Sequence, residues 1–158
     1  MYKKTSHKKR CQRTFSFLKT HISKESKILD LGVENPFSDF LKSEGFKIEN
    51  TNGEDLDEDL SAVLASDAAV ITAFEILEHL LSPYVLLKKI KAKKLLISVP
   101  LKLWFSPAYR SSTDLRDRHY HEFESWQLDW LLEKTGWIII TSDKWTNPTK
   151  KIGFRTLF

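Results

Sequence analysis

The sequence predicts an α/β fold in which a doubly wound, mostly parallel sheet lies between two layers of helices and ends in an antiparallel C-terminal edge. Short, largely apolar runs occupy residues 28–31, 68–72 and 94–99, which is typical of strands that are buried on both faces. Helical patterns with start and stop signals alternate with these runs and indicate consecutive βα units. We therefore expect a three-layer α/β/α arrangement.

The first half of the chain predicts a helix, a strand, a second helix and a second strand. Phe15, Leu18 and Ile22 recur at helical spacing. Asn35 is a good N-cap, and Pro36 suits the first position of a helix. The expected elements are a helix over residues 7–22, a strand over 27–31, a helix from Pro36 to Gly45 and a strand over 46–51.

The second half predicts further βα units and a closing pair of strands. We interpret the acidic residues 54–59 as a solvated turn with helix-capping roles rather than as a metal site. Residues 101–123 lack a clear period, and such a long segment is typical of a lid, a binding loop or a disordered segment. The remaining expected elements are a short helix over 60–64, strands over 68–72 and 94–99, helices beginning at Ser82-Pro83 and at Ser125, and terminal strands over 137–141 and 153–158.

Positive charge is concentrated at the N-terminus. Eight of the 25 lysines and arginines precede the first acidic residue, Glu25, so the rest of the chain carries 17 basic and 21 acidic residues. We therefore expect a basic arm over residues 1–13 and a single domain over residues 14–158. The arm is either a solvated terminus or a contact site for nucleic acid phosphates or an acidic partner.

Composition also predicts the cellular compartment of the protein. The chain of 158 residues has one cysteine, Cys11, and no cysteine and histidine cluster at metal-ligand spacing, so we expect neither a disulfide nor a bound metal. No run approaches the roughly 18 apolar residues of a membrane span, and the charged N-terminus is unlike a secretory signal. These features predict a cytoplasmic protein without a membrane partner.

Five segments occur in a characteristic order: ILDLG (28–32), AVITAFEILEHL (69–80), SPYVLLKKI (82–90), LLISVP (95–100) and HEFESWQLDWLLEKTGW (121–137). In this order they resemble class I S-adenosylmethionine-dependent methyltransferases, and most closely the small-molecule branch that carries an LEH motif. The resemblance covers about residues 13–144. It implies a Rossmann-like fold, S-adenosylmethionine as the cofactor and transfer of its methyl group to an acceptor.

The resemblance also implies a cofactor site beyond the carboxyl ends of the strands, where open α/β sheets bind ligands. Asp30 and Gly32 match the acid and the first glycine of the turn that holds the amino-acid half of the cofactor. Asn52 falls at the position of the acid that holds the ribose hydroxyls, and Glu54 and Asp55 are near enough to replace it. The cofactor contacts implied in this way are Asp30, Gly32, Asn52, Asp55, Phe74 and Glu75.

The turn after the first strand departs from the family pattern of three alternating glycines. Glu34 and Pro36 stand in place of two of them. The Glu34 carboxylate and the missing backbone donor at Pro36 both disfavour a pyrophosphate, so they argue against a dinucleotide. They argue less strongly against a methyl donor, which has no phosphate and is positively charged. The same departures support a second hypothesis, a methyltransferase-like domain that has lost cofactor binding and acts as an interaction module.

The acceptor site is expected in the long segment and the LEH motif. Methyl transfer depends mainly on positioning, so no catalytic triad is needed, none is found and the catalytic residues stay unassigned. The contacts expected for a small-molecule acceptor are His79, Tyr109, Arg110, His119 and His121. A buried histidine with a structural hydrogen bond is the alternative for His79, and an exposed loop is the alternative for the others.

Overall fold

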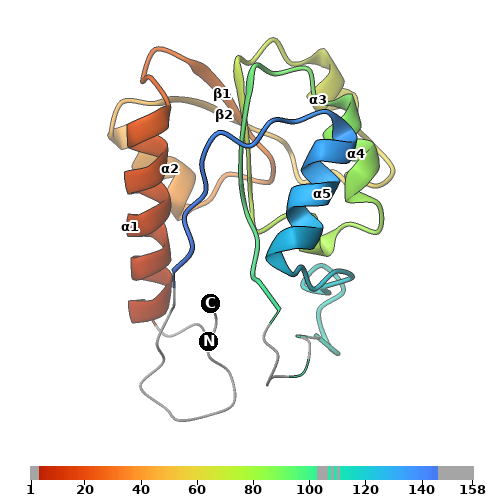
Figure 1. Ribbon diagram of the computed structural model, residues 1–158. Helices are drawn as coiled ribbons and strands as arrows, with labels where there is room; N and C mark the ends of the chain where they lie inside the picture. The colour runs from red at the N-terminus through yellow and green to blue at the C-terminus, as the bar shows by residue number, and fades with distance from the viewer. Residues whose placement is uncertain (1–3, 103–106, 108, 110, 146–158) are drawn as a thin grey trace.

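The computed structural model describes residues 4–102, 107, 109 and 111–145 (Figure 1). The elements in chain order are α1 (Lys4–His21), β1 (Lys27–Asp30), α2 (Pro36–Ser43), β2 (Lys47–Asn50), α3 (Ser61–Ala65), β3 (Val70–Phe74), the 3-10 helix η1 (Leu77–His79), α4 (Pro83–Lys89), β4 (Lys94–Ser98) and α5 (Ser125–Thr135). The strands expected from the apolar runs are confirmed, and so are the helices that follow them.

The four strands are parallel and lie in the order β2-β1-β3-β4. Asp30 of β1 lies opposite Asn50 of β2 and opposite Thr72 of β3. The chain passes from β1 to β2 on one side and from β3 to β4 on the other, so the strand order reverses between β1 and β3. Ligands of open α/β sheets bind at the carboxyl ends of the strands at such a point.

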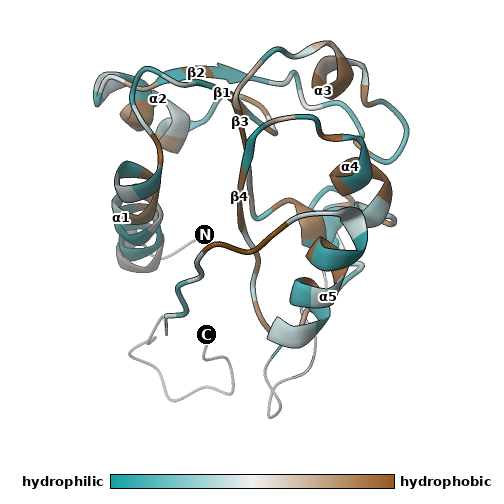
Figure 2. Ribbon diagram, turned by 45° about the horizontal axis from the view of Figure 1, so that its top comes forward, coloured by the Kyte–Doolittle hydropathy of each residue, from teal (hydrophilic) through white to brown (hydrophobic). Residues whose placement is uncertain are grey.

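Helices cover both faces of the sheet, as expected for a three-layer arrangement (Figure 2). On one face, Leu18 of α1 and Leu41 of α2 pack with Ile28 and Val70. On the other face, α3, α4 and α5 pack against alternate strand residues, and the buried side chains there include Leu29, Ile71, Val63, Leu86 and Leu132. Adjacent residues of one strand thus face opposite layers, which explains why the central strands are apolar along most of their length.

The C-terminal edge differs from the prediction. Residues 137–141 form no strand, and Ile138 and Ile140 are 82% and 87% exposed. The Trp137 indole donates a hydrogen bond to the carbonyl of Leu87 at 3.1 Å, so this end of the segment is held against α4 rather than along a strand. The predicted partner, 153–158, lies outside the described residues, and the described sheet is parallel throughout.

The N-terminal helix crosses the expected boundary between the arm and the domain. α1 runs without a break from Lys4 to His21, and Thr14 and Leu18 on it are buried. Residue 13, where the arm was expected to end, therefore lies inside this helix.

In the part of the chain that the structure describes, no helix combines the length and the apolar character that a bilayer crossing requires.

Candidate functional site

Asp30 connects the ends of three neighbouring strands. Its Oδ1 accepts a hydrogen bond from the Thr72 hydroxyl at 2.5 Å, and its Oδ2 accepts one from Asn50 Nδ2 at 3.1 Å. The side chain is buried, and this burial raises the pKa of Asp30 to about 6, although both hydrogen bonds oppose the rise. Asp30 therefore organises the carboxyl edge where β2, β1 and β3 meet.

Gly32 turns the chain sharply after β1. Its φ of +120° lies in a region that residues with a Cβ rarely adopt. The Gly32 amide donates to Thr51 Oγ1 at 2.8 Å, and its carbonyl accepts from Asn50 Nδ2 at 3.3 Å. A Cβ added at Gly32 would have Ile76 Cδ1 as its nearest described neighbour, at 3.7 Å. The backbone of the turn is thus held by hydrogen bonds with Asn50 and Thr51. Beyond the chain neighbours of Gly32, no described backbone atom lies among the nearest contacts of the added Cβ.

The two unusual residues of this turn have local structural roles. The Glu34 carboxylate pairs with Lys42 on α2, and the Glu34 side chain is 59% exposed. Pro36 is the first residue of α2, where its missing N–H is not needed. Asn35 caps the helix, because its Oδ1 accepts the backbone N–H groups of Phe37 and Ser38 at 2.9 and 3.2 Å. The predicted cap is confirmed, and it occupies donors that a phosphate would otherwise use.

The segment after β2 lies beside the same turn. Glu54 accepts hydrogen bonds from the backbone N–H of Asn52 at 2.9 Å and from its Nδ2 at 3.2 Å. Gly53 has a φ of +83°, and a Cβ there would come within 2.7 Å of Val33 Cγ1. Asp55 has a different role, since its Oδ1 accepts the Asp57 N–H at 3.0 Å within the acidic turn. Asn52 and Glu54 therefore form a polar pair directly after Thr51, whose hydroxyl accepts the Gly32 amide.

Two further carboxylates of the acidic run accept backbone N–H groups. Asp57 accepts those of Leu81 and Ser82 at 2.7 and 2.9 Å, and Asp59 accepts that of Ser61 at 2.8 Å. Neither α3 nor α4 has a side-chain hydrogen bond at its N-cap residue, so these carboxylates hold the turn beside the starts of the two helices and are not their N-caps.

Glu75 joins three elements at the end of β3. Its Oε2 pairs with Arg10 Nη1 of α1 at 3.1 Å, and its Oε1 accepts the Ser98 hydroxyl of β4 at 2.8 Å. Its φ of +56° is unusual for a residue with a side chain. Phe74 packs edge-on against Phe37 of α2, with ring centroids 6.0 Å apart. Of these two predicted contacts, Glu75 presents polar atoms at the sheet edge and Phe74 packs against a helix.

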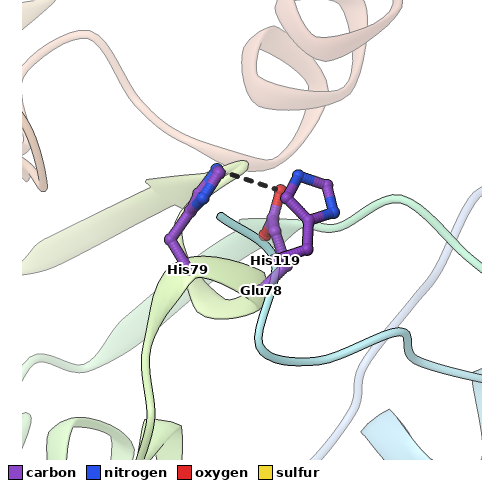
Figure 3. A group of neighbouring side chains, drawn as sticks. All are labelled: Glu78, His79 and His119. Atoms are coloured by element: carbon purple, nitrogen blue, oxygen red, sulfur yellow. Dashed lines mark ion pairs between the residues drawn. The ribbon is translucent and has the colours of Figure 1, made fainter. Parts of the chain in front are cut away.

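Glu78, His79 and His119 form a compact polar group next to Glu75 (Figure 3). Glu78 is only 1% exposed, and burial, reinforced by the nearby Glu75 carboxylate, raises the pKa of Glu78 to about 8. His79 Nε2 lies 3.9 Å from Glu78 Oε1, and the two imidazole rings meet edge to face at 4.8 Å. Burial and the neighbouring His79 lower the pKa of His119.

Residues of the long segment divide into two sets. The Tyr109 ring lies 4.6 Å from the His119 ring, and the Tyr109 N–H donates to Glu122 at 2.8 Å. His121 instead stacks on Phe123 at 5.6 Å, and its Nε2 lies 3.2 Å from the Leu81 carbonyl. Arg110 lies outside the described residues. The structure thus brings His79, Tyr109 and His119 together and places His121 in other contacts.

Sequence reasoning did not single out several polar residues at this edge. Glu78 is a carboxylate inside the apolar run ILEHLL, and a charge in such a run signals a buried functional or paired group. Thr72 is a hydroxyl residue at the end of an apolar strand, and its partner Asp30 is 42 residues away. Only the strand register brings the two together.

A parallel sheet with polar side chains gathered at its carboxyl edge, around a strand-order reversal, defines a Rossmann-like α/β protein. Residues 4–142 match the model of a family described as a methyltransferase domain, and the chain belongs to this family. A comparison with curated proteins gives no match.

Proposed function

We propose that the protein binds S-adenosylmethionine at the carboxyl edge of the sheet and transfers its methyl group to a small-molecule acceptor. The observation that carries this proposal is the open turn at Gly32. Beyond its chain neighbours, the nearest described atom to an added Cβ is a single side-chain carbon at 3.7 Å, and Glu34 is more than half exposed and paired with Lys42. These contacts support a turn that a donor molecule can approach.

The charge of this edge also fits the donor. Asp30 and Glu75 lie at the ends of β1 and β3, whereas burial raises the pKa of Glu78, one turn later, to about 8 and keeps it mostly protonated at neutral pH. The donor carries a positive sulfonium and a positive ammonium group, which a carboxylate favours, and it has no phosphate for the carboxylate to repel. Arg10 and Glu75 offset each other's charge, so Asp30 supplies the net negative charge at this edge.

Each cofactor residue then has a distinct task. Gly32 lets the backbone approach the amino-acid half of the donor, and Asp30 holds the turn through Thr72 and Asn50. The Asn52–Glu54 pair supplies hydrogen-bond acceptors for ribose hydroxyls. Phe74 and Glu75 line the side towards β3, while Asp55 contributes only through the fold of the neighbouring turn.

When bound, the donor supplies an electrophilic methyl group, and the protein has to hold an acceptor atom in line with it. We place the acceptor beside His79, Tyr109 and His119, which meet near the end of β3. Arg110 and His121 remain proposed contacts on the same segment.

Calorimetric titration with S-adenosylhomocysteine tests the proposal. Saturable binding with a micromolar Kd supports a methyl-donor site. The absence of heat at millimolar ligand would contradict the proposal and would favour the alternative, an interaction module that has lost cofactor binding. Glu34 and Pro36, which stand in place of two family glycines, are the residues that support this alternative.

A further inference from the structure

The group at Glu78, His79 and His119 has the chemistry of a metal site. One carboxylate and two imidazoles contribute ligand atoms that all lie within 4.8 Å of one another. Glu78 and His79 come from η1, whereas His119 comes from the segment between β4 and α5. Figure 3 shows the Glu78 carboxylate between the two rings. Residues 40 positions apart in the chain thus converge on one point.

Two buried atoms of this group lack hydrogen-bond partners among the described residues. They are Glu78 Oε2 and His119 Nδ1. The N–H groups of Tyr120 and His121 donate to the backbone carbonyl of Glu78, at 2.8 and 3.2 Å, so they leave its carboxylate unsatisfied. A buried polar atom without a partner typically destabilises a fold by about 1–3 kcal/mol. A bound cation would supply the missing interaction for both atoms.

His79 is already oriented to act as a ligand. Its Nδ1 lies 3.0 Å from the carbonyl of Arg118, an acceptor, so Nδ1 carries the proton. Its Nε2 consequently presents a lone pair, and this atom lies 3.9 Å from Glu78 Oε1. Metal-binding histidines are commonly fixed in this way, with the second nitrogen bonded to a backbone carbonyl or a carboxylate.

His119 has a carboxylate neighbour of its own. Glu122 Oε1 lies 3.7 Å from His119 Nδ1, and Glu122 also accepts the Tyr109 N–H at 2.8 Å. Glu122 therefore stands at the rim of the group, where it adds negative charge.

We propose that Glu78, His79 and His119 form a binding site for a first-row divalent transition-metal ion. Two imidazoles and one carboxylate suit zinc, iron or cobalt better than magnesium or calcium, which prefer oxygen ligands throughout. Ligand distances of about 2.1 Å require the three atoms to approach to roughly 3.4 Å, so the side chains close by about an ångström when the ion binds. Three protein ligands leave further coordination positions open.

The experiment is a titration of the full-length protein with Co²⁺ alone, after treatment with a chelator and desalting. The expected result is one equivalent of bound ion with visible d–d absorption, which added Zn²⁺ abolishes by displacement. The readout requires no methyl donor, so this proposal and the proposed function fail independently. Absence of saturable Co²⁺ absorption at about 100 μM ion would overturn the metal site.

Two variants and a matched control assign the ligands. Glu78→Gln and His119→Gln should each weaken Co²⁺ binding by about tenfold or more, a loss typical of altered metal sites. His121→Gln is the control, because His121 lies on the same segment but outside the group, and it should leave the affinity unchanged. Equal affinity in all three variants, or a loss only in His121→Gln, would contradict the assignment.

A second measurement covers variants that fold poorly. Binding to the native state raises the Tm of the wild-type protein, and above the Kd the stabilisation grows with the logarithm of the ion concentration. Co²⁺ or Zn²⁺ should raise the Tm of the wild type and of His121→Gln but not of Glu78→Gln, which keeps the shape of the buried side chain. No rise in the Tm of the wild type would contradict the proposal without any variant.

Discussion

The carboxylate of Glu34 pairs with Lys42 on α2, and the Glu34 side chain is more than half exposed. The glutamate that stands in place of a family glycine thus has a partner on the next helix. Lys42 also lowers the pKa of Glu34, so the carboxylate remains charged and paired at neutral pH. The proposed methyl-donor site therefore requires the Glu34–Lys42 pair to leave Gly32 accessible, which a substitution of Glu34 can test.

Glu34→Ala should leave the affinity for S-adenosylhomocysteine within about twofold of the wild type. The reason is that the Glu34 side chain is more than half exposed and is paired with Lys42, and exposed pairs contribute little. Calorimetric titration of both proteins measures this. A tenfold gain in affinity on removal of the carboxylate would show that Glu34 obstructs the site.

Gly32→Ala should reduce that affinity by at least about tenfold, because the added methyl group lies where the donor approaches the backbone. Gly136→Ala is the matched control. Both glycines have positive φ values, +120° and +94°, and neither added Cβ meets an atom closer than 3.7 Å. Each substitution should destabilise the fold by about 1 kcal/mol. Equal affinities of the two variants would remove Gly32 from the site.

Asp30 should make the wild-type protein less stable as the pH rises. Its folded pKa of about 6 exceeds its ordinary value of 3.8, so the folded state binds the proton more tightly. The resulting stabilisation is complete below about pH 4 and is lost as the pH rises through 6; between pH 4.5 and 7 the loss is about 2 kcal/mol. Asp30→Asn cannot titrate, so its free energy of unfolding should fall less over this interval.

Urea denaturation of both proteins at pH 4.5 and pH 7 measures this difference, since all other titrating groups are shared. Parallel pH profiles would mean that Asp30 keeps an ordinary pKa in the fold.

Asn35→Ala should destabilise the protein by about 1 kcal/mol, because two N–H groups of the first turn of α2 lose their acceptor. Asn52→Ala is a suitable comparison, since Asn52 is exposed and bonds to Glu54 rather than to a helix. Thermal or urea unfolding should show the larger loss in Asn35→Ala. An equal loss in both variants would argue against the cap.

Much of the fold follows from local signals in the sequence. Apolar runs predict β1, β3 and β4, and the Asn35-Pro36 pair predicts the start of α2, because strand burial and helix capping depend on neighbouring residues. The segment WIII at 137–140 shows the limit of such signals. Its side chains have high strand propensity, but a strand needs a partner, and the hydrogen bond of Trp137 holds the segment against α4.

The site could be predicted only in part. Asp30 and Gly32 stand in one contiguous motif, so their place at the carboxyl edge followed from the first βα unit. The pairing of Asp30 with Thr72, and of Glu78 with His119, depends on strand order and on the course of a long loop. No periodicity encodes these distances, so the spacing of Glu78, His79 and His119 along the chain does not predict that they converge.

In the proposed function, the turn after β1 holds the methyl donor. Crystals grown with millimolar S-adenosylhomocysteine test it most directly. We predict electron density for the ligand over Gly32, along the carboxyl ends of β2, β1 and β3 and within hydrogen-bond distance of the Asn52–Glu54 pair. A structure from such crystals in which this turn holds only water, or in which the ligand occupies another surface, would contradict it.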